Sequence, residues 1–304
     1  MSTHVLELKN VTKRVGSKTL VDNLSFQVGK GEIVGLLGPN GAGKTTTMKM
    51  MVGLFSMSEG DVTINGHSVK TARSKALAHV GGILENPEFY PFLSGYDNLM
   101  QYARMADGVT EERIKEVVEL LGLSNALDKK VKAYSLGMRQ RLGIAQALLH
   151  KPAVLILDEP TNGLDPAGIR EMREYMRQIA NEEGISILVS SHLLSEVELM
   201  CDRIIIIQNG KFVEDQRIIE SETDEVTLAL VVDDTAKASA ILAKDFNLVA
   251  DVHEKKVLIT LEDEQVPAII TKLASEGIAI FRVMEEKKSL EDRFLEKTGG
   301  NQIV

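Results

Sequence analysis

The chain has 304 residues, 44% of them hydrophobic, which is enough for about two globular domains, and it contains no run of roughly 18 to 20 apolar residues that would predict a membrane helix. Its net charge of −9 argues against a general nucleic-acid coat or an anionic membrane surface as the partner. The N-terminus has no basic segment followed by an apolar core, so we expect no secretory signal. The single cysteine, Cys201, excludes an intrachain disulfide and fits a reducing cytoplasm.

The first 35 residues or so predict short strands that are separated by turns, among them residues 4–10 (HVLELKN) and 24–28 (LSFQV). The near-continuous apolar run at residues 32–37 (EIVGLL) predicts a strand that is buried on both faces. Turn-forming residues interrupt the pattern at 38–44, and residues 45–54 (TTTMKMMVGL) predict a helix. A glycine-rich loop therefore joins a buried strand to a helix.

This loop, GPNGAGKT, fits the phosphate-loop pattern G-x-x-x-x-G-K-S/T in the context that the pattern requires. Its glycines allow successive backbone N–H groups to surround phosphate oxygens, and the helix N-terminus adds positive potential. We expect Lys44 to reach the β- and γ-phosphates of ATP and the Thr45 hydroxyl to bind Mg²⁺. The predicted nucleotide contacts of the loop are Gly38, Pro39, Asn40, Gly41, Ala42, Gly43, Lys44, Thr45 and Thr46.

The middle of the chain, from residue 93 to about 149, is expected to be mainly helical. In EERIKEVVELLGL, residues 111–123, the apolar positions recur at the spacing of an amphipathic helix. A second buried strand follows at residues 153–160 (AVLILDEP) and ends in two carboxylates. We predict that Asp158 holds Mg²⁺, directly or through water, and that Glu159 orients and polarises the attacking water.

A helix at residues 167–184 and buried strands at 185–192 and 203–208 complete an alternating pattern, which predicts an α/β domain with a mainly parallel sheet. After about Asp215 the order becomes βαββαβ, the ferredoxin-like pattern, and a last helix, SLEDRFLEKTG, follows. We therefore expect an ATP-binding domain at residues 1–218, with a helical subdomain at about 88–150, and an α+β domain at 219–304.

Three further segments narrow the class. Residues 134–152 (YSLGMRQRLGIAQALLHKP) resemble the signature segment of ATP-binding cassette (ABC) proteins, in which Ser135 and Gly137 match and Tyr134, Leu136 and Met138 depart from the commonest form. Alone, this pentapeptide also fits an ordinary helix capped by Ser135. Residues 162–165 (NGLD) resemble the D-loop, and His192 resembles the switch histidine. In this order the motifs resemble those of ABC-transporter ATP-binding subunits over roughly residues 4–215.

The resemblance implies a P-loop nucleotidase fold, with a mainly parallel core sheet, an N-terminal antiparallel part, a helical insert and the small C-terminal domain. It also implies that two cassettes close head to tail around two ATP molecules. Ser135, Gly137 and Asp165 would then lie at the nucleotide, with Ser135 and Gly137 contacting the γ-phosphate that Lys44 of the other copy holds. Lys44, Glu159 and His192 would be the catalytic residues, and ATP and Mg²⁺ the cofactors.

The chain departs from the family at two positions. Val15 stands where many cassettes have a Tyr or Phe that stacks on adenine, which removes a stacking contribution of about 0.5–1.5 kcal/mol. Glu85 ends an apolar run where relatives usually carry Gln, and a carboxylate there can also bind Mg²⁺. Because a buried carboxylate is costly, we expect Glu85 to face a positive charge, and we place that charge on the magnesium. The alternative is a Glu that faces solvent in a loop.

The segment ENPEFYPFLSGYDNL and the ending SLEDRFLEKTG resemble the cassettes of bacitracin and lantibiotic exporters. This implies a homodimer that powers export of antibiotic peptides, drugs or lipids, bound at the cytoplasmic face of the membrane to a separate ABC-2 type permease. Pro87, Phe89, Tyr90 and Pro91 would contact the permease, and the C-terminal domain would support the dimer or the permease contact. Two alternatives stay open: a soluble ABC ATPase that acts on ribosomes or DNA, although we expect no nucleic-acid partner, and a regulatory module that binds ATP without turnover.

Overall fold

The computed structural model describes residues 4–218, 225–253 and 255–285. They form two compact units, one within residues 4–218 and the other within residues 225–285. Each unit has a hydrophobic core of its own, and each is described separately.

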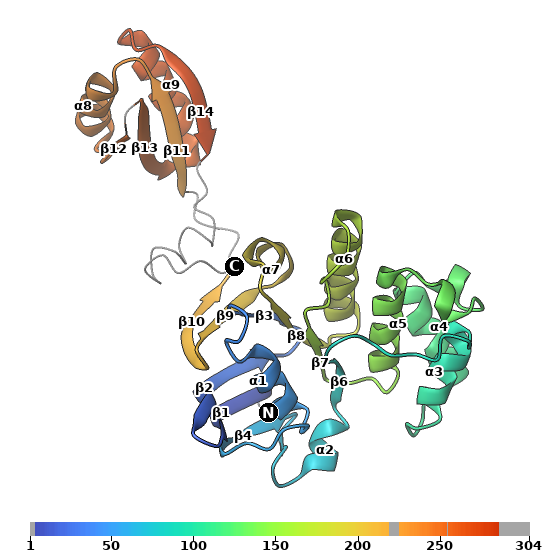
Figure 1. The fold of residues 1–304 in the computed structure, drawn as a ribbon. Helices are drawn as coiled ribbons and strands as arrows, with labels where there is room; N and C mark the ends of the chain where they lie inside the picture. The colour runs from blue at the N-terminus through green and yellow to red at the C-terminus, as the bar shows by residue number, and fades with distance from the viewer. Residues whose placement is uncertain (1–3, 219–224, 254, 286–304) are drawn as a thin grey trace. The chain divides into compact units, whose positions relative to one another are not determined.

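The centre of the first unit is a six-stranded sheet with the order β10-β9-β3-β8-β7-β6 (Figure 1). Every pair in it is parallel except β9 and β10, which form a hairpin. The apolar runs that predicted buried strands lie at its centre, since β3 and β8 are buried at every position. The strands are β3 (Ile33–Leu37), β6 (Val80–Ile83), β7 (Val154–Asp158), β8 (Ser186–Ser191), β9 (Arg203–Gln208) and β10 (Lys211–Arg217).

An antiparallel sheet with the order β2-β1-β4-β5 packs on this part of the unit and shares its apolar core. It contains the predicted N-terminal strands together with two strands, β4 and β5, that the sequence patterns did not predict. Its strands are β1 (His4–Val15), β2 (Lys18–Gly29), β4 (Glu59–Ile64) and β5 (His67–Ser68). The helices of this region are α1 (Lys44–Met51) and the short α2 (Arg73–Leu77).

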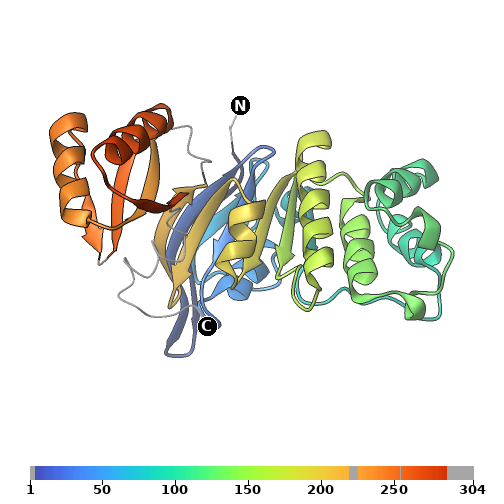
Figure 2. The ribbon, with the colours of Figure 1, turned by 90° about the horizontal axis from the view of Figure 1, so that it is seen from above.

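The expected helical segment lies at the β6 side of the core sheet (Figures 1 and 2). Its helices are α3 (Gly95–Ala103), α4 (Glu111–Leu120) and α5 (Leu136–Leu148). The predicted apolar stripe of α4 is fully buried. Arg113 of α4 is buried as well, and it is held by Glu183 and by the carbonyl of Leu148. Two more helices flank the sheet, α6 (Pro166–Glu182) and α7 (Leu194–Met200).

The second unit has the predicted βαββαβ order, and its four strands form a sheet with the order β12-β13-β11-β14. Both helices cover one face of that sheet (Figure 1). The hairpin starts later than predicted, because β12 runs from Asp251 to His253 whereas the expected strand covers 247–252. The other elements are β11 (Glu225–Val232), α8 (Thr235–Phe246), β13 (Lys256–Glu262), α9 (Val266–Ser275) and β14 (Ile280–Glu285). The expected helix at 289–299 lies outside the described residues.

Candidate nucleotide-binding site

The glycine-rich loop runs from the end of β3 into α1, as predicted, and close backbone contacts hold its shape. A Cβ at Gly38 would lie 2.2 Å from the carbonyl oxygen of Ile207. Gly43 has φ of 103° and would place a Cβ 2.9 Å from the carbonyl oxygen of Leu20. Only glycine fits such positions, so these two glycines are required for the backbone path of the loop.

Lys44, the first residue of α1, is only 6% exposed. Its Nζ donates to the carbonyl oxygen of Gly38 at 2.6 Å and lies 3.8 Å from Oε1 of Glu159. Burial lowers the pKa of the Lys44 amine, although the charges of Glu159 and Asp158 oppose this shift. A buried ammonium group whose direct partners are carbonyl oxygens is well suited to receive an anion.

Asp158, at the end of β7, receives two hydroxyl groups. Thr45 Oγ1 donates to Asp158 Oδ2 at 2.8 Å, and Ser190 Oγ donates to Oδ1 at 2.5 Å. The described residues contain no group of three or more His, Cys, Asp or Glu side chains that could hold a metal. A hydroxyl and a carboxylate nevertheless fit Mg²⁺, because this ion is typically held by one or two protein oxygens together with phosphate and water. Thr45 and Asp158 are therefore suited to the role predicted for them.

Glu159 lies between the other two predicted catalytic residues. Its Oε2 is 3.2 Å from Nδ1 of His192, and its Oε1 is on the Lys44 side. The two side chains lie within ion-pair distance, but the buried Nδ1 of His192 has no hydrogen-bond partner among the described residues. Glu159 also has a φ of 47°, a value that residues with a Cβ rarely adopt. The three predicted catalytic side chains thus meet at one place.

A cavity of about 160 Å³ opens beside Glu159 and His192, and Asn162 of the D-loop segment also lines it. Thr161 fixes one wall, since its Oγ1 donates to Oε2 of Glu196 at 2.6 Å. The cavity has room for water molecules next to the carboxylate that we expect to act on one.

The signature and D-loop residues both act as helix caps in this chain. Ser135 Oγ accepts the N–H of Met138 at the start of α5, and Asp165 accepts the N–H of Gly168 at the start of α6. Gly137 faces Leu164 of the D-loop segment, 3.6 Å from where its Cβ would lie. The structure has no hydrogen bond or ion pair between these residues and Lys44 within the described chain. Their predicted nucleotide contact would require a second copy.

The two positions that depart from the family are both exposed. Val15 is the last residue of β1 and is 57% exposed, on the same hairpin as Leu20, whose carbonyl lies against Gly43. Glu85 corrects one expectation: its side chain is 69% exposed and is therefore not a costly buried carboxylate. The charge that it faces in this structure is Lys49, whose Nζ donates to Glu85 Oε1 at 2.7 Å.

Sequence reasoning missed Ser190 and Lys49. Ser190 binds Asp158, and its Oγ also accepts the N–H of Glu159 at 2.9 Å, so it fixes both acids. The polar ending SSH on a buried strand was the available signal, but only His192 was taken from it. Nothing local marks Lys49, because a lysine in the last turn of a helix usually serves only the helix dipole.

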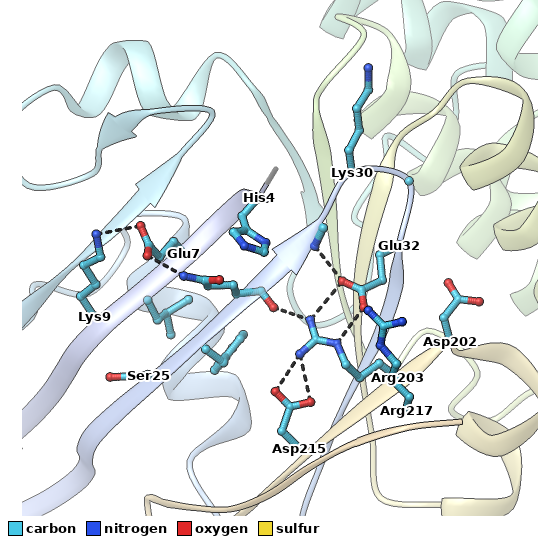
Figure 3. A pocket seen from close by; sticks show the side chains of 15 residues that line it. His4, Glu7, Lys9, Ser25, Lys30, Glu32, Asp202, Arg203, Asp215 and Arg217 are labelled. Carbon is cyan, nitrogen blue, oxygen red and sulfur yellow. Dashed lines mark hydrogen bonds and ion pairs between the residues drawn. The ribbon is translucent and has the colours of Figure 1, made fainter. Parts of the chain in front are cut away.

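A second polar region lies at the other end of the core sheet and borders a hollow of about 1280 Å³ (Figure 3). Arg203, at the start of β9, donates to both carboxylate oxygens of Glu32, to Asp215 and to the carbonyl of Gln27 (Figure 3). These hydrogen bonds, first those that Arg203 donates to Glu32, raise the pKa of Arg203. The groups of this cluster bind one another, which indicates a structural role.

The phosphate loop, the acids that end β7 and the core sheet define a P-loop nucleotide-binding protein of the cassette class. The family model described as ABC transporter matches residues 21–162. An uncharacterised ABC transporter ATP-binding protein of Bacillus subtilis, YhcH, is 55% identical over 97% of this chain and 96% of its own length. The bacitracin transport ATP-binding protein BcrA of Enterococcus faecalis is 39% identical over 99% of this chain and 98% of its own.

A solved structure of the ATP-binding subunit of an ABC transporter is 31% identical, with a TM-score of 0.63 over 70% of this chain and 90% of that one. The chain belongs to the ATP-binding proteins of ABC transporters, and it is an ATPase whose activity is coupled to transport. Proteins of this family dimerise and pair with transmembrane permeases. No helix among the described residues is long and apolar enough to cross a membrane.

Proposed function

We propose that this chain is the ATP-hydrolysing subunit of an exporter of antibiotic peptides, drugs or lipids, and that it works as a homodimer on a separate ABC-2 type permease at the cytoplasmic face of the membrane. The meeting of Lys44, Glu159 and His192 beside Asp158 carries the hydrolytic part of the proposal. The full-length similarity to a bacitracin transport protein supports the cargo class.

In the proposed reaction the phosphate loop binds the ATP phosphates through its N–H groups and Lys44. Bound Mg²⁺, held by Thr45 and Asp158, would supply charge neutralisation at the phosphates. Glu159 orients a water molecule from the neighbouring cavity and accepts its proton, and His192 contacts the γ-phosphate. Ser190 keeps Asp158 and the backbone of Glu159 in position for these roles. These assignments agree with the distances, because Glu159 lies within 4 Å of both Lys44 and His192.

The head-to-tail dimer would complete the site with Ser135 and Gly137 of the second copy. A helix N-terminus with a nearby hydroxyl is suited to the γ-phosphate, since it offers N–H groups and positive potential. The Ser135 hydroxyl caps its own helix through the Met138 N–H, and it can still donate its proton to a phosphate oxygen.

The segment after Glu85 offers a surface for the permease. Asn98, which is buried, binds the N–H and the carbonyl of Tyr90 and so fixes the backbone. The rings of Tyr90 and Phe92 nevertheless point outward, 5.8 Å apart and mostly exposed. Phe89 packs edge-on against Tyr102 within the chain. We therefore place the contact mainly on Tyr90 and Phe92, and Phe92 was not among the residues that the sequence suggested.

The test combines two measurements on the full chain. ATP hydrolysis by the wild type, compared with Glu159→Gln, establishes turnover, and equal rates would instead support a regulatory module that does not turn over ATP. Co-purification of a six-helix membrane protein with the wild type, lost in a Tyr90→Ala/Phe92→Ala variant, tests the permease contact. Recovery of ribosomes or DNA in place of a membrane protein would contradict the transport role.

A further inference from the structure

The Lys49–Glu85 ion pair joins the helix of the phosphate loop to the segment that leads into the helical subdomain. Lys49 lies in the last turn of α1 and is 23% exposed, and its Nζ also lies 5.6 Å from the centre of the Phe55 ring. The hydrogen bond from Lys49 lowers the pKa of the Glu85 carboxyl group, so Glu85 is an anion with one oxygen already engaged.

The position of Lys49 on α1 places this pair close to the predicted magnesium ligands. Thr45 and Lys49 are four residues apart on one helix, so their side chains share a face and their Cβ atoms are about 5–6 Å apart. Thr45 is the residue that binds Asp158. Glu85 is thus bound to Lys49, which lies about one helical turn after Thr45, the residue that donates to Asp158.

The sheet leads to the same placement independently. In the parallel pair of β6 and β7, Ile83 lies beside Leu157, so Glu85 and Glu159 each come two residues after paired positions. Both residues have a positive φ, 74° at Glu85 and 47° at Glu159. Non-glycine residues in this region are uncommon, and such outliers gather where a chain directs a side chain into a functional site.

From these observations we infer that Lys49 is a positioning residue that competes with the nucleotide-bound magnesium for the Glu85 carboxylate. In the structure, Lys49 Nζ donates to Glu85 Oε1 and so holds the carboxylate. Glu85 would exchange the ammonium group for the metal when Mg²⁺ and ATP bind, and the segment after Glu85 would move with it. This inference rests on the proposed function and on the magnesium contact that the sequence predicts for Glu85. The inference explains why Glu85 stands where relatives usually carry Gln. The amide of Gln would bind the Lys49 ammonium group far more weakly and could not be held in this way.

The test measures the metal-dependent part of ATP binding. Calorimetric titration of ATP into the full chain is done with Mg²⁺ and again with EDTA, in a Glu159→Gln background that prevents hydrolysis. The ratio of the two dissociation constants reports only the contribution of the metal, because any effect of the substitution on ATP binding itself is present in both titrations. Lys49→Met should raise the ratio of the dissociation constant in EDTA to that in Mg²⁺ by about two- to fivefold, which is the range expected for loss of a competing exposed ion pair. Lys49→Arg, which keeps the charge, should leave the ratio close to the starting value.

The same substitution in a Glu85→Gln chain completes the design, because the amide removes the competition. There, Lys49→Met should leave the ratio unchanged. An equal shift in both backgrounds, or no shift in either, would overturn the inference. Lys9→Met, which removes an exposed pair with Glu7 on β1, is the matched control and should have no effect on the ratio. Failure of the proposed function would look different, since a wild-type chain that does not hydrolyse ATP contradicts the ATPase assignment whatever Lys49 does.

Discussion

The two ends of the core sheet each carry a polar cluster, and the clusters differ in how fully their groups are hydrogen-bonded. At the amino end, Arg203 binds Glu32, Asp215 and a backbone carbonyl, and each charge is matched within the chain. At the carboxyl end, Lys44 is buried with carbonyl partners, and the buried Nδ1 of His192 has no hydrogen-bond partner among the described residues. Charged groups that bind one another stabilise a fold, whereas buried polar groups whose hydrogen bonds are incomplete are arranged for a ligand. The larger hollow lies at the satisfied end, so size alone would have indicated the wrong site.

The sharpest way to separate the two ends is Glu159→Gln. If Glu159 activates water, loss of its charge should reduce ATP hydrolysis by about 10²- to 10⁴-fold, because an amide cannot accept the proton. The unfolding free energy should change by no more than about 0.5 kcal/mol, as the shape is kept. Steady-state phosphate release and urea denaturation measure the two effects. A variant that hydrolyses normally would remove Glu159 from the mechanism.

Arg203→Met should show the reverse pattern. The side chain is largely buried, and its loss leaves the Glu32 carboxylate without its cation, so we expect the first unit to lose about 1–3 kcal/mol of stability. Hydrolysis per folded molecule should be unchanged. Arg14→Met removes an exposed pair with Glu59 and should cost no more than about 1 kcal/mol. Equal losses for both substitutions in urea unfolding would show that the Arg203 cluster is no more important than a surface pair.

Low pH should reduce the stability of the first unit, because Glu32 at the amino end of the core sheet becomes protonated. Burial disfavours its charged form, yet the hydrogen bonds from Arg203 and the N–H of Gly29 lower its pKa below the ordinary 4.5. The folded chain therefore binds this proton less readily than the unfolded chain does. Its contribution to stability is complete above about pH 4.5 and is lost as the pH falls from there through the folded pKa. Unfolding free energies measured over that range should fall less steeply in Glu32→Gln than in the wild type.

The sequence predicted those parts of the molecule whose structure is determined by residues that are close together in the chain. The β3–loop–α1 unit and the acids after β7 were predicted because a buried apolar run followed by glycines or carboxylates has few other structural explanations. The strands β4 and β5 were missed because they are short and stabilised by pairing with β1 and with each other. Lys49 could not be assigned to Glu85 because 36 residues separate them, and only the fold brings α1 beside the end of β6.

The smallest effect is expected from Val15→Tyr, which tests how far the nucleotide end extends. Val15 is exposed at the end of β1, so a tyrosine can enter without disturbing the core. If Val15 lies against the base, an aromatic ring should strengthen ATP binding by about 0.5–1.5 kcal/mol through stacking. Fluorescence titration with ATP and, as a base-independent reference, inorganic triphosphate would measure the gain. Val249→Tyr, at an exposed valine of the second unit, is the matched control and should change neither affinity. Because stacking acts only on the base, equal tightening of ATP and triphosphate would place Val15 beside the phosphates, and no change in either would place it outside the site.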